Sequence, residues 1–169
     1  MNYQEVIKTR RSIRSFQDRP VKFSIIDALL NEAILAPSAH NRQPWRFLVL
    51  DGKEKNWIAD VMEQRDPITK NTARVMREAP LIILVWNCEE NHDIADYISI
   101  GGMIEQFCLS ATNQGLGTLW MTYPLIIEKE IQQKFAIAYE LISIIALGYA
   151  KEEPSPRPRK ELEELLLTI

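Results

Sequence analysis

Two short basic clusters are the first candidates for chemistry in this chain. Segment 8–14 holds four cationic side chains without an acidic one, and segment 157–160 holds three: Lys8, Arg10, Arg11 and Arg14, then Arg157, Arg159 and Lys160. Guanidinium groups bind phosphate oxygens in pairs, and each unit charge pair at ~4 Å contributes on the order of 4 kcal/mol at an effective dielectric constant of 20, before desolvation. Ser12 adds a hydroxyl between the arginines. The clusters suit a phosphate anchor, and they equally suit a solvated surface.

A third candidate is the segment 36–47, which is rich in hydrogen-bonding side chains. Pro37 and Pro44 indicate a loop. Asn41 and Gln43 each offer donors and an acceptor, which suits a ligand edge with mixed hydrogen-bonding groups, such as a flavin pyrimidine ring. A plain connector between a helix and a strand is the competing interpretation.

Several common sources of reactivity are missing from the sequence. It contains no glycine-rich phosphate loop, no metal-ligand spacing of histidine, cysteine and acidic residues, and no Gly-x-Ser-x-Gly motif. Cys88 and Cys108 lie in apolar runs, which predicts two buried free thiols. If the protein is an enzyme, we expect its reactivity to come from a bound cofactor rather than from a side chain or a metal.

Composition limits the class of protein. The 169 residues suit one domain, and 46% hydrophobic with 25% charged residues is the balance of an ordinary globular protein. The net charge of -3 gives the molecule as a whole no reason to bind nucleic acid or an acidic membrane. The first residues lack the apolar region of a signal peptide, and no apolar run approaches the ~20 residues of a membrane span. We therefore expect a cytoplasmic protein with no nucleic-acid or membrane partner.

The spacing of apolar residues predicts the elements that position these segments. Helical spacing marks 2–10, 24–36, 93–114, 128–135 and 161–167. Short apolar runs predict strands over 46–50, 81–86, 118–122 and 141–149. Ser24 and Pro37 are expected to begin and end the second helix, and Asp51 with Gly52 to form a turn.

Two further segments have their own character. The charged stretch 53–78 is expected to hold helical pieces around Pro67, and the prolines of 151–159 favour an extended polyproline arm.

The predicted helix over 93–114 is apolar on nearly every side, which is hard to achieve within one small subunit. Gly101 and Gly102 lie in its middle, where glycine lowers helix stability unless two backbones must approach closely. A dimer interface explains both features, and a central core helix of a monomer is the alternative. Gly115 and Gly117 are expected to form a glycine C-cap at its end.

Four motifs in a fixed order resemble the nitroreductase family of FMN-dependent oxidoreductases. They are Arg10–Phe16, Ala36–Ser38 with Trp45–Phe47, Gly115–Trp120, and Leu147–Tyr149 with Pro156–Arg159. Together they extend from one end of the chain to the other, which favours the phosphate interpretation of both basic clusters. The stretches 36–45 and 120–125 are also similar to the FMN-binding domain attached to some coenzyme F420 ligases.

The resemblance implies a fold and an assembly. It implies one α+β nitroreductase-like domain over residues 1–169, with 151–169 as a C-terminal arm. A central, mostly antiparallel sheet is flanked by helices, and an intertwined homodimer holds two FMN sites at its interface.

The resemblance also implies roles for particular residues. Those on the FMN phosphate and nearby flavin atoms are Arg10, Arg11, Ser12 and Arg14, with Arg159 and Arg157 closing the site. Those that approach the same flavin from the other subunit are Pro37, Ser38, Ala39 and Asn41, where Ala39 replaces a frequent hydroxyl. Gly117 and Thr118 line the ring near N5, and a pyrimidine contact is implied near Asn71 or Thr72.

The implied activity is transfer of a hydride from NADH or NADPH through FMN to a small electron-poor acceptor, such as a nitroaromatic or a quinone. The chemistry then occurs at FMN N5 and needs no catalytic side chain. A flavin-binding sensor or carrier without efficient turnover shares every motif and stays open as the alternative.

Overall fold

A four-stranded antiparallel sheet forms the centre of the computed structural model, which describes residues 1–91 and 93–167. In spatial order the strands are β1 (Trp45–Asp51), β2 (Leu81–Asn87), β4 (Glu140–Gly148) and β3 (Gly117–Met121). The strand predictions are confirmed, and each end lies within one residue of its expected place. All residues of β2 are buried, as expected for a central strand covered on both faces.

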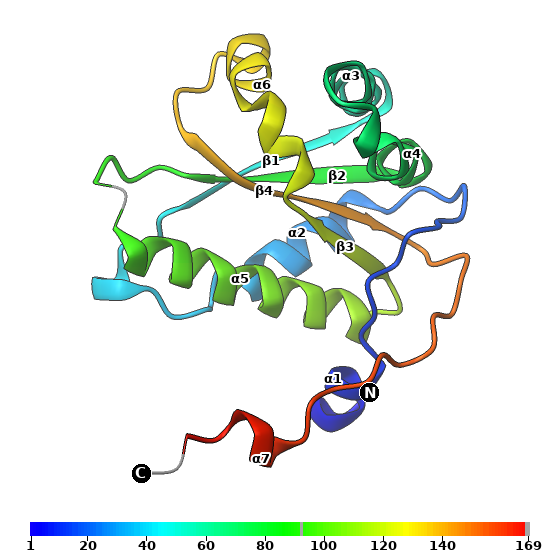
Figure 1. The fold of residues 1–169 in the computed structure, drawn as a ribbon, viewed down its shortest axis with the longest axis vertical. Coiled ribbons are helices and arrows are strands. Elements are labelled where there is room, and N and C mark those ends of the chain that lie inside the picture. Colours follow the sequence, from blue (N-terminus) through cyan, green and yellow to red (C-terminus); the bar gives the residue numbers. More distant parts are fainter. Residues whose placement is uncertain (92, 168–169) are drawn as a thin grey trace.

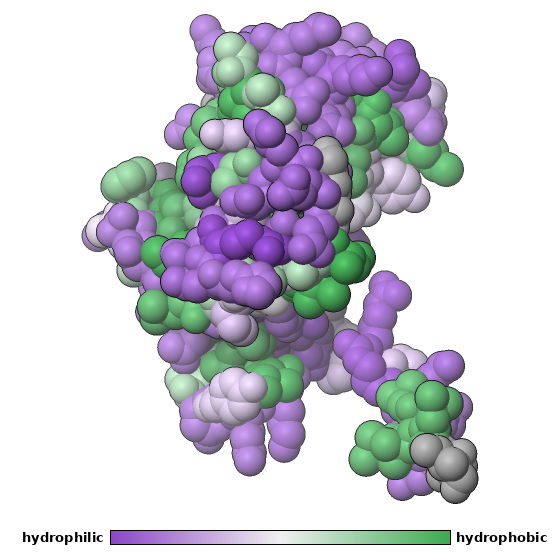
Figure 2. Space-filling view, turned by 90° about the vertical axis from the view of Figure 1, so that its left-hand side faces the viewer, coloured by the Kyte–Doolittle hydropathy of each residue, from purple (hydrophilic) through white to green (hydrophobic). Residues whose placement is uncertain are grey.

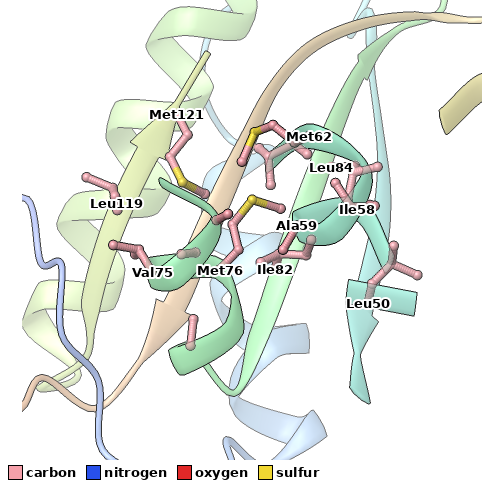
Figure 3. Close-up of a cluster of buried hydrophobic side chains, with 14 of the residues drawn as sticks. Leu50, Ile58, Ala59, Met62, Val75, Met76, Ile82, Leu84, Leu119 and Met121 are labelled. Atoms are coloured by element: carbon pink, nitrogen blue, oxygen red, sulfur yellow. The ribbon is translucent and has the colours of Figure 1, made fainter. Parts of the chain in front are cut away.

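Helices cover both faces of this sheet (Figure 1). One face carries α2 (Phe23–Ala33) and α5 (Ile94–Asn113), and the other carries α3 (Gly52–Arg65), α4 (Lys70–Glu78) and α6 (Glu128–Phe135). The side chains of β2 alternate between two hydrophobic clusters, because successive strand residues point to opposite faces. Ile83 packs on the α5 side. Ile82 packs on the α4 side, beside Met62 and Met76 (Figure 3).

The helices form near their predicted places, with some ends corrected. Here α1 covers Tyr3–Thr9, α6 matches its prediction, and α7 covers only Leu162–Leu165. Ser24 is not the N-cap of α2, and the helix ends before residue 36. Instead Lys22 occupies the cap position, because its carbonyl already accepts the N–H groups of Ile25 and Ile26.

The charged stretch 53–78 forms a pair of helices. Asp51 and Gly52 lead directly from β1 into α3 instead of forming a separate turn, and the short helix η2 (Pro67–Thr69) connects α3 to α4. The buried Lys55 ammonium donates to the carbonyls of Met76, Arg77 and Ala79 at 2.7–2.9 Å. Burial lowers the pKa of Lys55. These three bonds fasten α3 to the end of α4.

Two glycines predicted to cap α5 have different roles. Gly115 ends the helix with φ of 75°, while the N–H groups of Gly115 and Leu116 reach the carbonyls of Thr112 and Ala111. Gly117 instead begins β3, so the prediction that it belongs to the cap is wrong. A Cβ there would lie 2.6 Å from the Ile13 side chain. Close packing therefore explains this glycine.

The segment after α1 and the segment after β4 lie side by side near the C-terminal end of α5 (Figure 1). We call residues 10–17 the strap and residues 151–167 the arm. Ser12 forms a β-bridge with Thr118, and Phe16 forms one with Ala150. The Lys151 N–H donates to the Ser15 carbonyl at 3.0 Å. The strap thus runs between β3 and the start of the arm.

Candidate functional site

A cavity of about 740 Å³ lies between α1, the strap and the arm. Its volume is typical of small-molecule sites, which measure ~300–1,000 Å³. Six of its eleven lining residues are cationic and none is acidic: Ile7, Lys8, Arg10, Arg11, Ser12, Arg14, Pro154, Ser155, Pro156, Arg157 and Arg159. The structure therefore brings residues of both basic clusters, all but Lys160, onto the walls of one cavity.

Main-chain groups hold these arginines in place. The Arg11 guanidinium donates to the carbonyls of Lys8 (2.7 Å), Arg10 (2.8 Å) and Pro154 (3.3 Å), which links the strap to the arm. Arg14 donates to the Ser12 carbonyl at 3.2 Å. Carbonyl oxygens orient a guanidinium without removing its net charge, so these arginines keep their full attraction for an anion.

Two carboxylates contact cavity residues from outside the lining. Arg10 Nε lies 3.1 Å from Glu105 Oε1 on α5. The Glu152 carboxylate accepts a hydrogen bond from the main-chain N–H of Arg14. Even with both included, six positive charges face two negative ones. This excess of four positive charges favours binding of an anion, such as the dianion of a phosphomonoester.

Gly117 and Thr118 lie next to the strap but inside the protein. Thr118 is 2% exposed, and its carbonyl accepts the Ile13 N–H at 2.9 Å. The missing Cβ of Gly117 makes room for Ile13. In this chain the two residues position the strap, and their predicted contact with a flavin stays a prediction.

The loop residues Pro37, Ser38, Ala39 and Asn41 lie elsewhere. They form or directly precede the short helix η1 (Ala39–Asn41) at the N-terminal end of α5, while the strap and the start of the arm lie near the opposite end (Figure 1). The Ala39 N–H donates to Ser99 Oγ at 3.2 Å. None of the four lines the cavity. One chain therefore brings the basic clusters together but not the loop.

The loop has unusual backbone angles. His40, Asn41 and Gln43 have φ of 52°, 56° and 51°. This left-handed region costs roughly 1–2 kcal/mol for a residue with a side chain, although asparagine tolerates it better. Ser38 Oγ accepts the Gln43 N–H at 3.0 Å, and Asn41 Oδ1 accepts the Gln43 amide at 3.3 Å. The polar side chains predicted to contact a ligand thus also shape the loop.

Arg42 joins this loop to α5. Its Nε and Nη2 donate to Asp96 Oδ1 at 2.9 and 2.7 Å, and Nη2 also donates to Asp93 Oδ2 at 3.0 Å. Hydrogen bonding to Asp96 raises the pKa of Arg42. The Ala95 N–H, followed by Arg42, lowers the pKa of Asp93. No local pattern in the sequence indicates this role of Arg42, because its partners lie more than 50 positions away.

One side of α5 remains exposed in the single chain. Ile94 and Ile98 are 71% and 69% exposed, and a Cβ at Gly102 would have no atom within 4 Å. Trp120 lies beside Gly101 and is 43% exposed. The expectation that α5 is buried on most sides is thus only partly met within one subunit.

The end of the arm is also apolar and exposed. Figure 2 looks onto the end of the molecule where α5 begins, and the arm projects away from the body at the lower right. Four leucines near its end are exposed: Leu162, Leu165, Leu166 and Leu167. The body that faces the viewer is mostly hydrophilic.

The two cysteines differ in their surroundings. Cys108 is buried, and burial raises its pKa to about 11. Cys88 is only half-buried, which corrects its prediction. It follows the last residue of β2, and its N–H donates to the Pro44 carbonyl at 2.8 Å. Beyond the sheet, Cys88 is no longer covered on both sides.

The described residues form neither a metal-ligand cluster nor a membrane-spanning helix. Among residues 1–91 and 93–167, no three histidine, cysteine or acidic side chains are grouped as metal ligands would be. No helix in the same part of the chain has the length and apolarity of a membrane span. Asn71 and Thr72 lie in the first turn of α4, on the sheet face opposite α5, and their predicted pyrimidine contact stays a prediction.

Known proteins resemble this chain over nearly its whole length. The family model described as "Nitroreductase family" matches residues 7–149. A "Putative NADH dehydrogenase/NAD(P)H nitroreductase" of Methanothermobacter thermautotrophicus is 35% identical, over 93% of this chain and 82% of that protein. No relative described here carries the name of a coenzyme F420 ligase, so that likeness stays a prediction.

Solved structures share the fold. A "putative nitroreductase in complex with fmn" from Desulfovibrio desulfuricans has a TM-score of 0.85 and 27% identity, covering 100% of this chain and 98% of that one. The FMN and NADPH-dependent nitroreductase NfnB from Sphigopyxis sp. strain HMH has a TM-score of 0.89, covering 100% and 99% of the two chains, at 19% identity. The predicted α+β fold class is confirmed by these matches.

Proposed function

The chain belongs to the nitroreductase family, and on that basis we propose that it is an FMN-dependent oxidoreductase. It takes a hydride from NADH or NADPH and delivers it to an electron-poor acceptor such as a nitroaromatic or a quinone. The observation that carries this proposal is the cavity between the strap and the arm, where six cations and no acid line the wall. The names of the relatives support the same class of reaction.

The residues of the cavity fit the phosphate of FMN. Arg14 comes from the strap and Arg159 from the arm, and Ser12 adds a hydroxyl to the same lining. Arg10, Arg11 and Arg157 add charge around the same space. A ligand with a phosphomonoester at one end is therefore anchored at that end, and the rest of the molecule extends out of the cavity.

When bound, FMN supplies the hydride chemistry. The contribution of the chain is to neutralise the phosphate, to hold the flavin against rotation and to leave space for the second substrate. None of these tasks needs a side chain that forms a covalent bond or moves a proton, which agrees with the types of residue that line the cavity.

We further propose that the functional unit is a homodimer. In one chain the loop 37–41 and the basic cavity lie near opposite ends of α5 (Figure 1). A second copy packed against the exposed side of α5, at Ile94, Ile98 and Gly102, is the simplest way to bring its loop to this cavity. Such a dimer also covers apolar surface that water otherwise contacts.

The absorbance spectrum of the purified protein tests this proposal. We expect flavin bands, or their appearance after FMN is added and the excess removed. NADH and NADPH oxidation is then measured with menadione or nitrofurazone as the acceptor. Protein that never retains FMN contradicts the proposal, whereas retention without any acceptor-dependent rate identifies a flavin-binding sensor or carrier.

A further inference from the structure

The loop of residues 38–43 has a shape that it cannot keep by itself. Three of its residues, His40, Asn41 and Gln43, are left-handed and none is glycine. Such residues persist only where surrounding contacts compensate for the strain. Arg42 lies among them with ordinary angles of -68° and -27°, so its side chain is free of that strain and can serve as an anchor.

The anchor of Arg42 is a buried carboxylate. Asp96 is 1% exposed, and both Nε and Nη2 of Arg42 bond to its Oδ1. Asp93 adds a third bond to the same guanidinium. Both carboxylates belong to the start of α5, where the helix dipole favours negative charge. The anchoring point is therefore fixed to a 20-residue helix rather than to another loop.

A second contact fixes the other side of the loop to the same helix. Ser99 Oγ accepts the Ala39 N–H at 3.2 Å and donates to the Ala95 carbonyl at 2.6 Å. Arg42 and Ala39 thus attach the loop to the first two turns of α5 on both sides of His40 and Asn41. The exposed residues Pro37 and Asn41 are presented outward from this attachment.

We propose that Arg42 and Asp96 are a positioning pair for the cofactor, holding the loop 37–41 in the one backbone shape that contacts the flavin. This inference rests on the proposed function and adds to it. Neither side chain touches the cofactor. The pair acts through the loop, whereas the phosphate is held independently by the strap and the arm.

The independence of these two regions gives a discriminating experiment. Arg42→Gln and Asp96→Asn are compared with wild type for FMN affinity, measured by quenching of flavin fluorescence, and for the rise in melting temperature caused by inorganic phosphate. We expect the dissociation constant for FMN to rise about 10- to 100-fold in each variant. The stabilisation by phosphate should stay the same, because phosphate reports on the cavity alone.

The combined variant and two controls complete the design. Arg42 and Asp96 act through the same contact, so their effects should not add. The double variant, Arg42→Gln with Asp96→Asn, should bind FMN about as tightly as whichever single variant has the lower affinity. Arg42→Lys keeps the charge but not the two-nitrogen contact, and its affinity should fall in between. Arg77→Gln removes a different surface arginine, paired with Asp60 and Glu63, and should bind FMN like wild type.

Each outcome is decisive. If wild type binds neither FMN nor phosphate, the proposed function fails. If wild type binds both, and the Arg42 and Asp96 variants bind FMN equally well, the positioning pair is refuted. It is also refuted if phosphate stabilisation falls in parallel with FMN affinity, or if the loss of FMN follows a change in the size of the protein on gel filtration. If Arg42→Gln does not fold, FMN affinity and stabilisation by phosphate are measured on Arg42→Lys and Asp96→Asn, and the same results support or refute the positioning pair.

Discussion

The loop around Arg42 and the cavity between the strap and the arm balance their charges in opposite ways. In the loop, one guanidinium faces two carboxylates, one of them buried. In the cavity, six cations line the wall and only Glu105 and Glu152, among the described residues, reach them from outside. The cation of the loop is therefore fully paired without a ligand, whereas the cavity has an excess of positive charge that a bound anion would reduce.

This difference assigns different tasks to the two regions. Like charges that share a cavity repel each other, and a bound anion relieves that repulsion. The cavity should therefore supply most of the affinity for a phosphate-bearing ligand. The loop brings little unbalanced charge, and its fixed backbone should supply orientation. Four predictions test this division, from the largest expected effect to the smallest.

Removal of two cavity arginines should have the largest effect. Charge-assisted hydrogen bonds contribute about 1.5–3 kcal/mol each, so Arg14→Ala with Arg159→Ala should raise the dissociation constant for FMN at least ~100-fold. Equilibrium dialysis or flavin fluorescence gives this number. Lys160→Ala is the matched control, because Lys160 adds a positive charge to the arm without lining the cavity. Unchanged affinity in the double variant removes the site assignment but not the fold.

Disruption of the exposed side of α5 should prevent dimer formation and so remove the loop of one copy from the cavity of the other. Ile98→Glu places a charge on the face proposed to meet a second copy, and we expect a monomer on sedimentation, with FMN affinity reduced about 10-fold or more. Ile68→Glu is the control, since Ile68 is 70% exposed and Ile98 is 69% exposed. A monomeric Ile98→Glu protein with wild-type affinity shows that the loop of a partner is not needed.

Inorganic phosphate should stabilise the cavity without any flavin. At ten times its dissociation constant it adds about 1.4 kcal/mol to the free energy of unfolding, or ~3–6 °C in melting temperature for a chain of this size. Differential scanning fluorimetry against chloride of equal ionic strength measures the shift. The shift should vanish in the Arg14 and Arg159 double variant and persist in Arg42→Gln. An equal shift in all of these proteins contradicts a specific site.

The smallest expected effect is a difference in reactivity between the two thiols, because Cys88 is half-buried and Cys108 is buried. At pH 8 native protein should react with one equivalent of a thiol reagent at Cys88, near the loop, while Cys108 stays protected. Folding raises the pKa of Cys108 from 9.0 to about 11. Between these values the folded protein keeps a proton that the unfolded chain has lost, so stability falls as pH rises through that window. Cys88→Ser should abolish the native reaction, and rapid labelling of Cys108 contradicts its burial.

Local patterns were enough to predict the sheet and most helices. The run Leu81–Trp86 is uniformly apolar, and only a central strand buries such a run on both faces. The prediction about Gly117 was wrong because the deciding contact, Ile13, lies about 100 positions earlier in the chain. The prediction that Ser24 is the N-cap was wrong for a local reason, because the carbonyl of Lys22 already accepts the first helical N–H groups.

The candidate site was predictable where residue type is sufficient. The two arginine-rich clusters could be recognised from composition alone, and the family resemblance favoured a phosphate over a solvated surface, so the basic residues of the cavity could be named before their positions were known. The partners of Arg42 are different, because the spacing of Asp93 and Asp96 is that of ordinary helix N-terminal acids. Their attachment to the loop depends on the packing of α5 against the connection between α2 and β1, which no short pattern contains.

The hydrogen bonds between the strap and the arm affect how the ends of the chain unfold. Most domains fray from their ends, because terminal segments have few contacts. Here Arg11 and Gln17 bond to the carbonyls of Pro154 and Ala150, so the strap and the start of the arm are fastened to each other. Peeling either end exposes its neighbour, and the two should exchange amide hydrogens as one cooperative unit. A ligand bound between the two segments should therefore slow amide exchange in both of them at once.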